Sequence, residues 1–303
     1  MPVPAIPNNT HITFPMNSMT VTAFCPGHIS GYFRRIGGET PAGTGSIGAG
    51  IVISEGVTAS VTPADSPSVI VNRIDGSGNR VRYASSSPPI EYVLEKLGAT
   101  VAVTTGCTLP IGAGFGLSAA ALLATITAAN RACSIGMTPH DIARLAHEAE
   151  VIHRTGLGDV AACQAGGRVV RDGPGIDGTI SRFFDLPEPL CAISFGPIST
   201  PSVLGSREQM ERVAAAFPQT RPKDAEDFFR LSLRFAEQSG LLTPDARAVI
   251  RKCTESGIPA RTTMLGNGVF AYGRNAREIL SDHGQVYTFR IANEGVRITG
   301  GSP

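Results

Sequence analysis

Short runs rich in β-branched residues, separated by Gly, Pro, Ser and Asp, dominate the N-terminal part of the chain. Runs of this kind predict short strands joined by turns. Segments of helical character follow from about residue 88. The strands predicted up to residue 195 are Thr20–Phe24, Gly50–Ser54, Val57–Thr62, Val69–Ile74, Thr100–Cys107, Arg168–Arg171, Thr179–Phe184 and Cys191–Phe195. The predicted helices are Pro88–Leu97, Ser118–Cys133 and Pro139–Val151.

A proline-marked joint at Leu186-Pro187-Glu188-Pro189 separates this part from a second region of mixed character. Its predicted elements are helices at Arg207–Ala216, Lys223–Gln238 and Pro244–Glu255, strands at Thr262–Leu265 and Val269–Tyr272, a short helix, and strands at Val286–Ile291 and Val296–Ile298. We therefore predict an α+β protein with domains at 19–186 and 187–303. Residues 1–18, rich in Pro, Asn and Thr, are predicted to be a poorly ordered extension or a misassigned start.

Composition narrows the function classes. The chain has 26 basic and 25 acidic residues and a net charge of +1, so nothing in it indicates a nucleic acid or an anionic membrane surface as a partner. Six scattered cysteines form no Cys-x-x-Cys pair, and we expect reduced thiols. With no apolar run of membrane-spanning length and no leader-like start, we expect a cytoplasmic protein.

The segment from Pro110 to Ala120 is a loop with three glycines that leads into a helix of small residues. Alternate glycines let backbone N–H groups turn toward a ligand, and a helix N-terminus adds partial positive charge. The loop therefore predicts an anion site, the alternative being a plain chain turn. A Walker loop is excluded, because the only three lysines, Lys96, Lys223 and Lys252, lie elsewhere.

A dinucleotide-binding loop is disfavoured by the spacing of its glycines, which are Gly112, Gly114 and Gly116. The next acid, Asp141, lies beyond the end of the following helix, whereas the dinucleotide motif requires an acid about 20 residues further on. A nicotinamide-dependent oxidoreductase thus remains only a distant alternative.

The helix predicted at Pro139–Val151 starts with a capping box formed by Thr138 and Asp141. Its two glutamates, Glu148 and Glu150, lie about 200° apart around the helix and cannot share a task. Glu148 follows Arg144 by four residues, an ordinary surface pair.

Glu150 shares a face with Ala143 and Ala146, which allow close approach of another helix. It is therefore the candidate ligand, and a buried salt-bridge partner is the alternative. Asp159 ends a Gly-Leu-Gly-Asp turn before a run of small residues. An acid in such surroundings loses hydration energy unless it has a partner.

The glycine loop resembles the second motif of the GHMP kinases, Pro-x-Gly-x-Gly-x-Gly-x-Ser-Ala-Ala, which binds the triphosphate of ATP without a Walker lysine. Most members carry Ser-Ser where this chain has Leu117-Ser118. The resemblance implies that Ser118 helps to hold Mg²⁺. The implied ATP-binding residues are Pro110, Gly112, Ala113, Gly114, Gly116, Leu117, Ser118 and Ala119.

A second resemblance, to mevalonate kinases, covers Glu-x-x-Ile-His, Gly-x-Asp and Gly-Gly. Its matches here are Glu150, Ile152, His153, Gly158, Asp159, Gly166 and Gly167. It implies that Glu150 binds Mg²⁺ with Ser118, and that Asp159 is the catalytic base. The superfamily implies two domains, the first like domain 2 of ribosomal protein S5 and the second ferredoxin-like, with the active site between them. Thr263–Phe270 resembles its third motif.

The stretch Phe24–Phe33 looks like the Pro-Gly-His-Ile-Thr-Gly-Phe-Phe motif of archaeal pantoate kinases, and the Gly45–Gly50 loop resembles a stretch that follows it there. This resemblance implies ATP-dependent phosphorylation of the primary hydroxyl of (R)-pantoate to 4-phosphopantoate, for coenzyme A biosynthesis. The alternatives are a homoserine-type or mevalonate-type kinase and a non-catalytic ligand sensor. The sequence leaves the oligomeric state open, a homodimer included.

The expected substrate-binding residues are His28, Ser30, Ser46, Gly48 and Arg154. His28 could contact the substrate or only hold its loop. Arg154 could counter phosphoryl charge or pair with Glu150. Arg34 or Arg35 is the expected partner of the substrate carboxylate, and surface positions are expected for His140, His147 and His283.

Overall fold

The structure, a computed structural model, describes residues 19–301. Its larger sheet begins with a long antiparallel hairpin formed by β1 (Val21–Ile36) and β2 (Gly45–Pro63). The sheet continues through β5 (Val101–Cys107), β3 (Ser68–Ile74) and β4 (Arg80–Ala84), while β12 (Arg297–Gly300) flanks β1. β6 (Arg168–Arg171) pairs with β2, and β7 (Ile180–Phe183) with β6.

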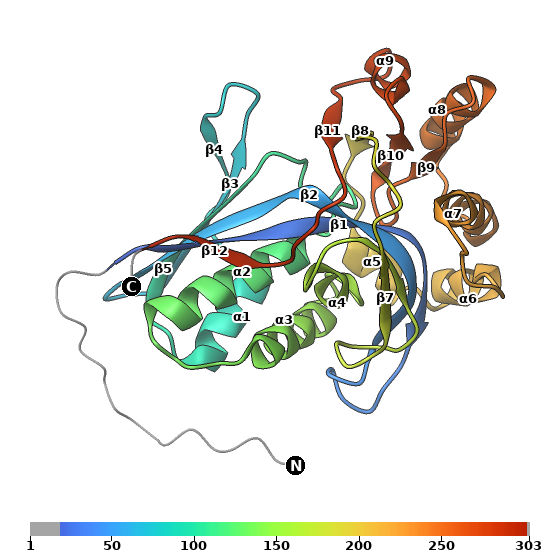
Figure 1. Ribbon diagram of the computed structural model, residues 1–303. Helices are drawn as coiled ribbons and strands as arrows, with labels where there is room; N and C mark the ends of the chain where they lie inside the picture. Colours follow the sequence, from blue (N-terminus) through green and yellow to red (C-terminus); the bar gives the residue numbers. More distant parts are fainter. Residues whose placement is uncertain (1–18, 302–303) are drawn as a thin grey trace.

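Helices of the N-terminal half cover one face of this sheet (Figure 1). They are α1 (Pro88–Leu97), α2 (Leu117–Ala132), α3 (Pro139–His153) and the short α4 (Asp159–Cys163). The alanine-rich α2 packs directly against β1 and β2, because its small side chains permit close contact. Its N-terminus is thereby fixed at the sheet.

A second, four-stranded antiparallel sheet has the order β11-β8-β10-β9. Its strands are β8 (Leu190–Gly196), β9 (Ala260–Thr262), β10 (Asn267–Tyr272) and β11 (Tyr287–Phe289). The accompanying helices are α5 (Thr200–Gly205), α6 (Arg207–Ala216), α7 (Ala225–Ser239), α8 (Pro244–Glu255) and α9 (Ala276–Ser281). The predicted α+β class is correct. Because β12 returns to the first sheet, the predicted domain boundaries stay a prediction.

Several sequence expectations were wrong. The ranges Gly50–Ser54 and Val57–Thr62 are strand as predicted, but they are not separate, because with the expected Gly45–Gly50 loop they form the single strand β2. The strand predicted at Thr20–Phe24 is only the start of β1, which continues through Pro26 because the hairpin register shifts there. The predictions missed β4, α4 and α5, and most of Thr262–Leu265 lies beyond the end of β9.

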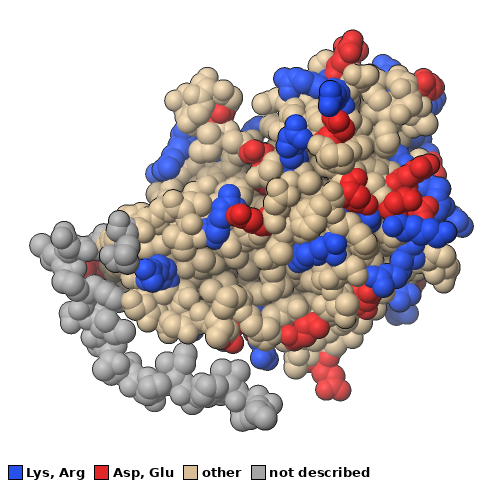
Figure 2. Space-filling model, in the orientation of Figure 1, with Lys and Arg blue, Asp and Glu red and all other residues tan. Residues whose placement is uncertain are grey.

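The predicted extension, residues 1–18, lies outside the described residues. Within 19–301, no helix has the length and apolar character needed to cross a membrane. Charged side chains of both signs are interspersed on the face shown in Figure 2, which agrees with the nearly neutral composition.

Candidate active site

The glycine loop before α2 has the backbone that the sequence predicted for an anion site. Gly112, Gly114 and Gly116 have φ values of 78°, 82° and 63°, a region that favours glycine. Gly116 is the N-cap of α2, and no side chain caps this helix. The N–H groups of the first turn therefore remain available for a bound anion.

Backbone atoms of the segment after β9 pack closely against the glycine loop. A Cβ atom on Gly114 would lie 2.8 Å from the carbonyl oxygen of Met264, and one on Gly266 would collide with Ala113. The Thr263–Phe270 segment thus packs against the glycine loop, as expected of the third motif. The N–H of His28 also donates a hydrogen bond of 2.9 Å to the carbonyl oxygen of Phe115.

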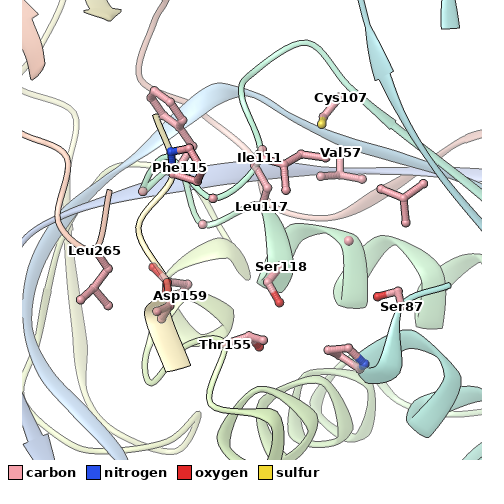
Figure 3. A pocket seen from close by; sticks show the side chains of 18 of the residues that line it. Val57, Ser87, Cys107, Ile111, Phe115, Leu117, Ser118, Thr155, Asp159 and Leu265 are labelled. Atoms are coloured by element: carbon pink, nitrogen blue, oxygen red, sulfur yellow. The ribbon is translucent and has the colours of Figure 1, made fainter. Parts of the chain in front are cut away.

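A cavity of about 610 Å³ opens in front of the loop, within the range of small-molecule sites (Figure 3). The expected site residues that line it are Gly112, Gly114, Gly116, Leu117, Ser118, Ser30 and Asp159. The sequence analysis did not single out Thr155 and Leu265, which also line it. The expected residues that do not line it are Pro110, Ala113, Ala119, His28, Ser46, Gly48, Glu150 and Arg154.

Asp159 is the first residue of α4 and reaches the cavity from a helix N-terminus, as Ser118 does from the start of α2 (Figure 3). Its side chain is 21% exposed, and its Oδ1 lies 2.6 Å from Nδ1 of the fully buried His28. Burial opposes ionisation of Asp159, but the hydrogen bond from His28 holds the pKa of this carboxyl below its ordinary value. Asp159 is therefore an ionised carboxylate facing the cavity.

Glu150 lies on the inner face of α3, as the helix geometry predicted. It is 1% exposed, whereas Glu148 forms the expected surface pair with Arg144 at 3.3 Å. Oε2 of Glu150 is buried without a hydrogen-bond partner, as is Oγ1 of Thr155. Burial and the charge on Asp159 raise the pKa of Glu150 well above its usual range, although the nearby hydroxyl of Ser118 counteracts this rise. A cation would resolve this imbalance.

Arg171 is the main residue that sequence reasoning missed. It lies on β6, is 3% exposed, and its Nη1 donates to the carbonyl oxygen and hydroxyl of Ser46 at 2.8 and 3.1 Å. Burial is the main cause that lowers the pKa of His28, and the charge on Arg171 lowers it further. The charge on Arg171 also lowers the pKa of Asp159, after the larger effects of burial and of His28. The available signal was an arginine at the end of the predicted strand Arg168–Arg171, beside two valines.

The other charged candidates lie further out. Arg34 stacks over the Phe217 ring with its guanidinium carbon 4.8 Å from the centroid, and Arg35 is exposed. Neither lines the cavity. Arg154 ends α3 in a left-handed conformation and forms no ion pair among the described residues, so the alternative pairing with Glu150 is not observed.

Two further expectations have structural outcomes. Gly48 is required by packing, because a Cβ atom there would collide with the carbonyl oxygen of Tyr32. His147 was expected at the surface, but it is fully buried and its Nε2 lies 2.7 Å from the carbonyl oxygen of Thr44. The surface expectation was right for His140, which pairs with Asp177.

Residues 86–167 match the family model of the GHMP kinases N terminal domain. The fold and the phosphate-loop cavity, together with this match, define a kinase of the GHMP superfamily. A homoserine kinase from Cytophaga hutchinsonii shares the fold, with a TM-score of 0.62 and 17% identity, covering 95% of this chain and all (100%) of that one.

More similar relatives narrow the class. A pantoate kinase of Methanospirillum hungatei is 43% identical over 93% of this chain and 98% of its own length. A pantoate kinase of Thermococcus kodakarensis is 35% identical over 87% of this chain and 93% of its own length. A solved "Phosphotransferase related to CoA biosynthesis pathway" superposes with a TM-score of 0.79 at 28% identity, covering 93% and 99%. The chain belongs to the pantoate kinases, and the expected resemblance is confirmed.

Proposed function

We propose that this protein transfers the γ-phosphoryl group of ATP to the primary hydroxyl of (R)-pantoate, giving 4-phosphopantoate and ADP in the cytoplasm, as a step toward coenzyme A. Family membership supports the substrate assignment. The observation that carries the chemistry is one cavity in which a backbone anion site and the ionised Asp159 face each other. Residues at the phosphate end are Pro110 to Ala119, of which the glycines contact the triphosphate.

Magnesium fits this site. Glu150 has a buried oxygen without a partner, and the Ser118 hydroxyl lies beside it. Among residues 19–301 there is no cluster of three or more His, Cys, Asp or Glu side chains, so the ion would take further ligands from the nucleotide and water. When bound, Mg²⁺ neutralises charge on the β- and γ-phosphates. Ser118 and Glu150 are the proposed protein ligands.

Asp159 is the proposed catalytic base. Its carboxylate accepts a hydrogen bond from the primary hydroxyl and thereby orients that oxygen toward the γ-phosphorus. The new O–P bond forms at the hydroxyl oxygen as the bond from the γ-phosphorus to ADP breaks, and the hydroxyl proton passes to Asp159. Because such transfers have a loose, in-line transition state, positioning supplies more of the rate than proton removal does.

The substrate carboxylate needs a cation, and we assign Arg171 to it in place of Arg34 or Arg35. None of the three arginines lines the cavity, but the charge of Arg171 acts on His28 and Asp159, which the other two do not reach. Arg171 is already fixed by Ser46, and its Nε is buried without a partner. A preordered guanidinium binds a carboxylate with little entropy loss. Ser30 lines the cavity and remains a substrate-binding candidate, whereas roles for Gly48 and Arg154 remain predictions.

The substrate also carries two methyl groups on the carbon next to the reacting hydroxymethyl. Leu265 lines the same cavity as Asp159 (Figure 3). It holds a left-handed backbone conformation, φ 59°, that costs a non-glycine residue about 1 kcal/mol or more. We assign Leu265 to the apolar contact with these methyl groups.

A panel of acceptors tests this function through ADP release with ATP and Mg²⁺. We expect turnover with pantoate and none with pantoyl lactone, which lacks both the carboxylate and the 4-hydroxyl. Homoserine and mevalonate should be poor acceptors. Equal rates with homoserine or mevalonate, or ADP release that no acceptor stimulates, would contradict the proposal.

A further inference from the structure

His28 makes two hydrogen bonds that connect separate parts of the site. Its backbone N–H donates to the carbonyl oxygen of Phe115 in the glycine loop at 2.9 Å. Its side-chain Nδ1 lies 2.6 Å from Oδ1 of Asp159, which is 131 residues away in sequence. His28 therefore touches both the loop that would hold the phosphates and the carboxylate that would accept the proton.

Two glycines pack closely against His28, one against its ring and one against its backbone. A Cβ atom on Gly50 would collide with Nε2 of His28, and one on Gly116 would lie 2.9 Å from the carbonyl oxygen of His28. The side chain is fully buried, and Nε2 has no hydrogen-bond partner. The bond to Asp159 is thus the only polar contact that the ring makes among the described residues.

The protonation of the ring follows from this arrangement. An ionised carboxylate can only accept hydrogen bonds, so Nδ1 must carry the proton that lies between His28 and Asp159. Burial lowers the pKa of His28 and favours a neutral ring with an unprotonated Nε2. The charged groups that act on this pair are Arg171 from β6, Arg182 from β7 and Glu150 from α3.

We infer that His28 is a positioning residue for phosphoryl transfer: it holds Oδ1 of Asp159 and leaves Oδ2 free for the acceptor hydroxyl, in fixed register with the glycine loop. This inference rests on the proposed function. It differs from substrate binding, because a fully buried ring behind Asp159 does not need to touch the acceptor.

Three substitutions separate positioning from other roles. His28→Ala removes the donor, whereas His28→Asn keeps an amide N–H close to the place of Nδ1 and His28→Gln places it further out. We expect His28→Ala to lower kcat on the order of 10²-fold, the typical cost of a misplaced catalytic group. The KM values for pantoate and ATP should stay within about threefold, since the backbone bond to Phe115 remains.

His28→Asn should recover most of the lost kcat, and His28→Gln little of it. His140→Asn is the matched control, because His140 is an exposed histidine paired with Asp177. A rise in the KM for pantoate with unchanged kcat in His28→Ala would overturn the inference in favour of substrate contact. Equal losses in the Asn and Gln variants would reduce His28 to a packing residue.

Nitrogen-15 NMR of His28 gives a readout that needs no turnover. We expect Nδ1 to be protonated and Nε2 unprotonated in the wild type, with this preference weakened in Asp159→Ala. An unprotonated Nδ1 in the wild type would contradict the inference directly. If the acceptor panel identifies another alcohol as the substrate, the proposed function fails but the kcat comparison is made with that alcohol, so the two failures are distinguishable.

Discussion

The two ends of the cavity present different chemical groups, backbone at one end and side chains at the other. At the proposed phosphate end, three glycines in left-handed conformations present backbone N–H groups, and the closest atoms to Gly114 and Gly116 are also backbone atoms. At the proposed acceptor end the groups are side chains: Asp159 is hydrogen-bonded to His28, and the nearby buried Arg171 is hydrogen-bonded to Ser46. Only substitution by proline removes a backbone N–H group, so other substitutions can damage the first end only through its shape. The second end can be damaged through single functional groups.

The largest effect is expected at the acceptor end. Asp159→Asn removes the negative charge but keeps the size of the side chain, and it should lower kcat by a factor on the order of 10² to 10⁴. ATP binding, measured by titration calorimetry, should be nearly unchanged, because the glycine loop is intact. A variant with wild-type turnover would remove Asp159 from the chemistry.

The next effect concerns the proposed metal ligand between the two ends. Glu150→Gln should raise the Mg²⁺ concentration needed for half-maximal activity on the order of tenfold, because the amide replaces a charged oxygen ligand with a neutral one. Glu148→Gln is the control on the same helix, since Glu148 only pairs with Arg144 at the surface. Equal Mg²⁺ dependence in the two variants would contradict the assignment of Glu150.

At the phosphate end, Gly114→Ala should raise the KM for ATP about tenfold, equivalent to about 1.4 kcal/mol of binding energy. The new methyl group would meet the carbonyl oxygen of Met264, and the positive φ would be strained. Gly76→Ala is the control, because nothing lies within 4 Å of its added Cβ. An unchanged KM for ATP in Gly114→Ala would show that the loop does not contact the nucleotide.

The smallest expected effect is a selective one. Arg171→Gln should raise the KM for pantoate several-fold, because the glutamine amide can still donate a hydrogen bond but no longer carries a charge. The KM for ATP should not change. Arg34→Gln, which alters a side chain stacked over Phe217 outside the cavity, is the control. A greater effect of Arg34→Gln would restore the original assignment.

Local chemistry explains which features the sequence could predict. The Thr138–Asp141 capping box and the glycines of the phosphate loop act within a few residues, and both are present as predicted. The inward face of Glu150 followed from helix periodicity. Each of these features depends on neighbours in the chain rather than on distant contacts.

The features that were missed depend on contacts between distant segments. Proline and glycine inside β1 and β2 are residues typical of turns and strand ends, so the sequence predicted breaks there. The register shifts of the long hairpin accommodate these residues within continuous strands. His147 is buried because it meets Thr44, 103 residues away in the chain. Arg171 reaches Ser46 across 125 residues. No local pattern contains these pairings.

The separation of the two ends is tested most directly by the double variant Gly114→Ala/Arg171→Gln, assayed over a matrix of ATP and pantoate concentrations beside the two single variants. We predict that the KM for ATP matches that of Gly114→Ala and the KM for pantoate matches that of Arg171→Gln, because the two changes act at independent sites. If either single variant changed both KM values equally, or if the double variant departed strongly from additivity, the two-ended account of the cavity would be contradicted.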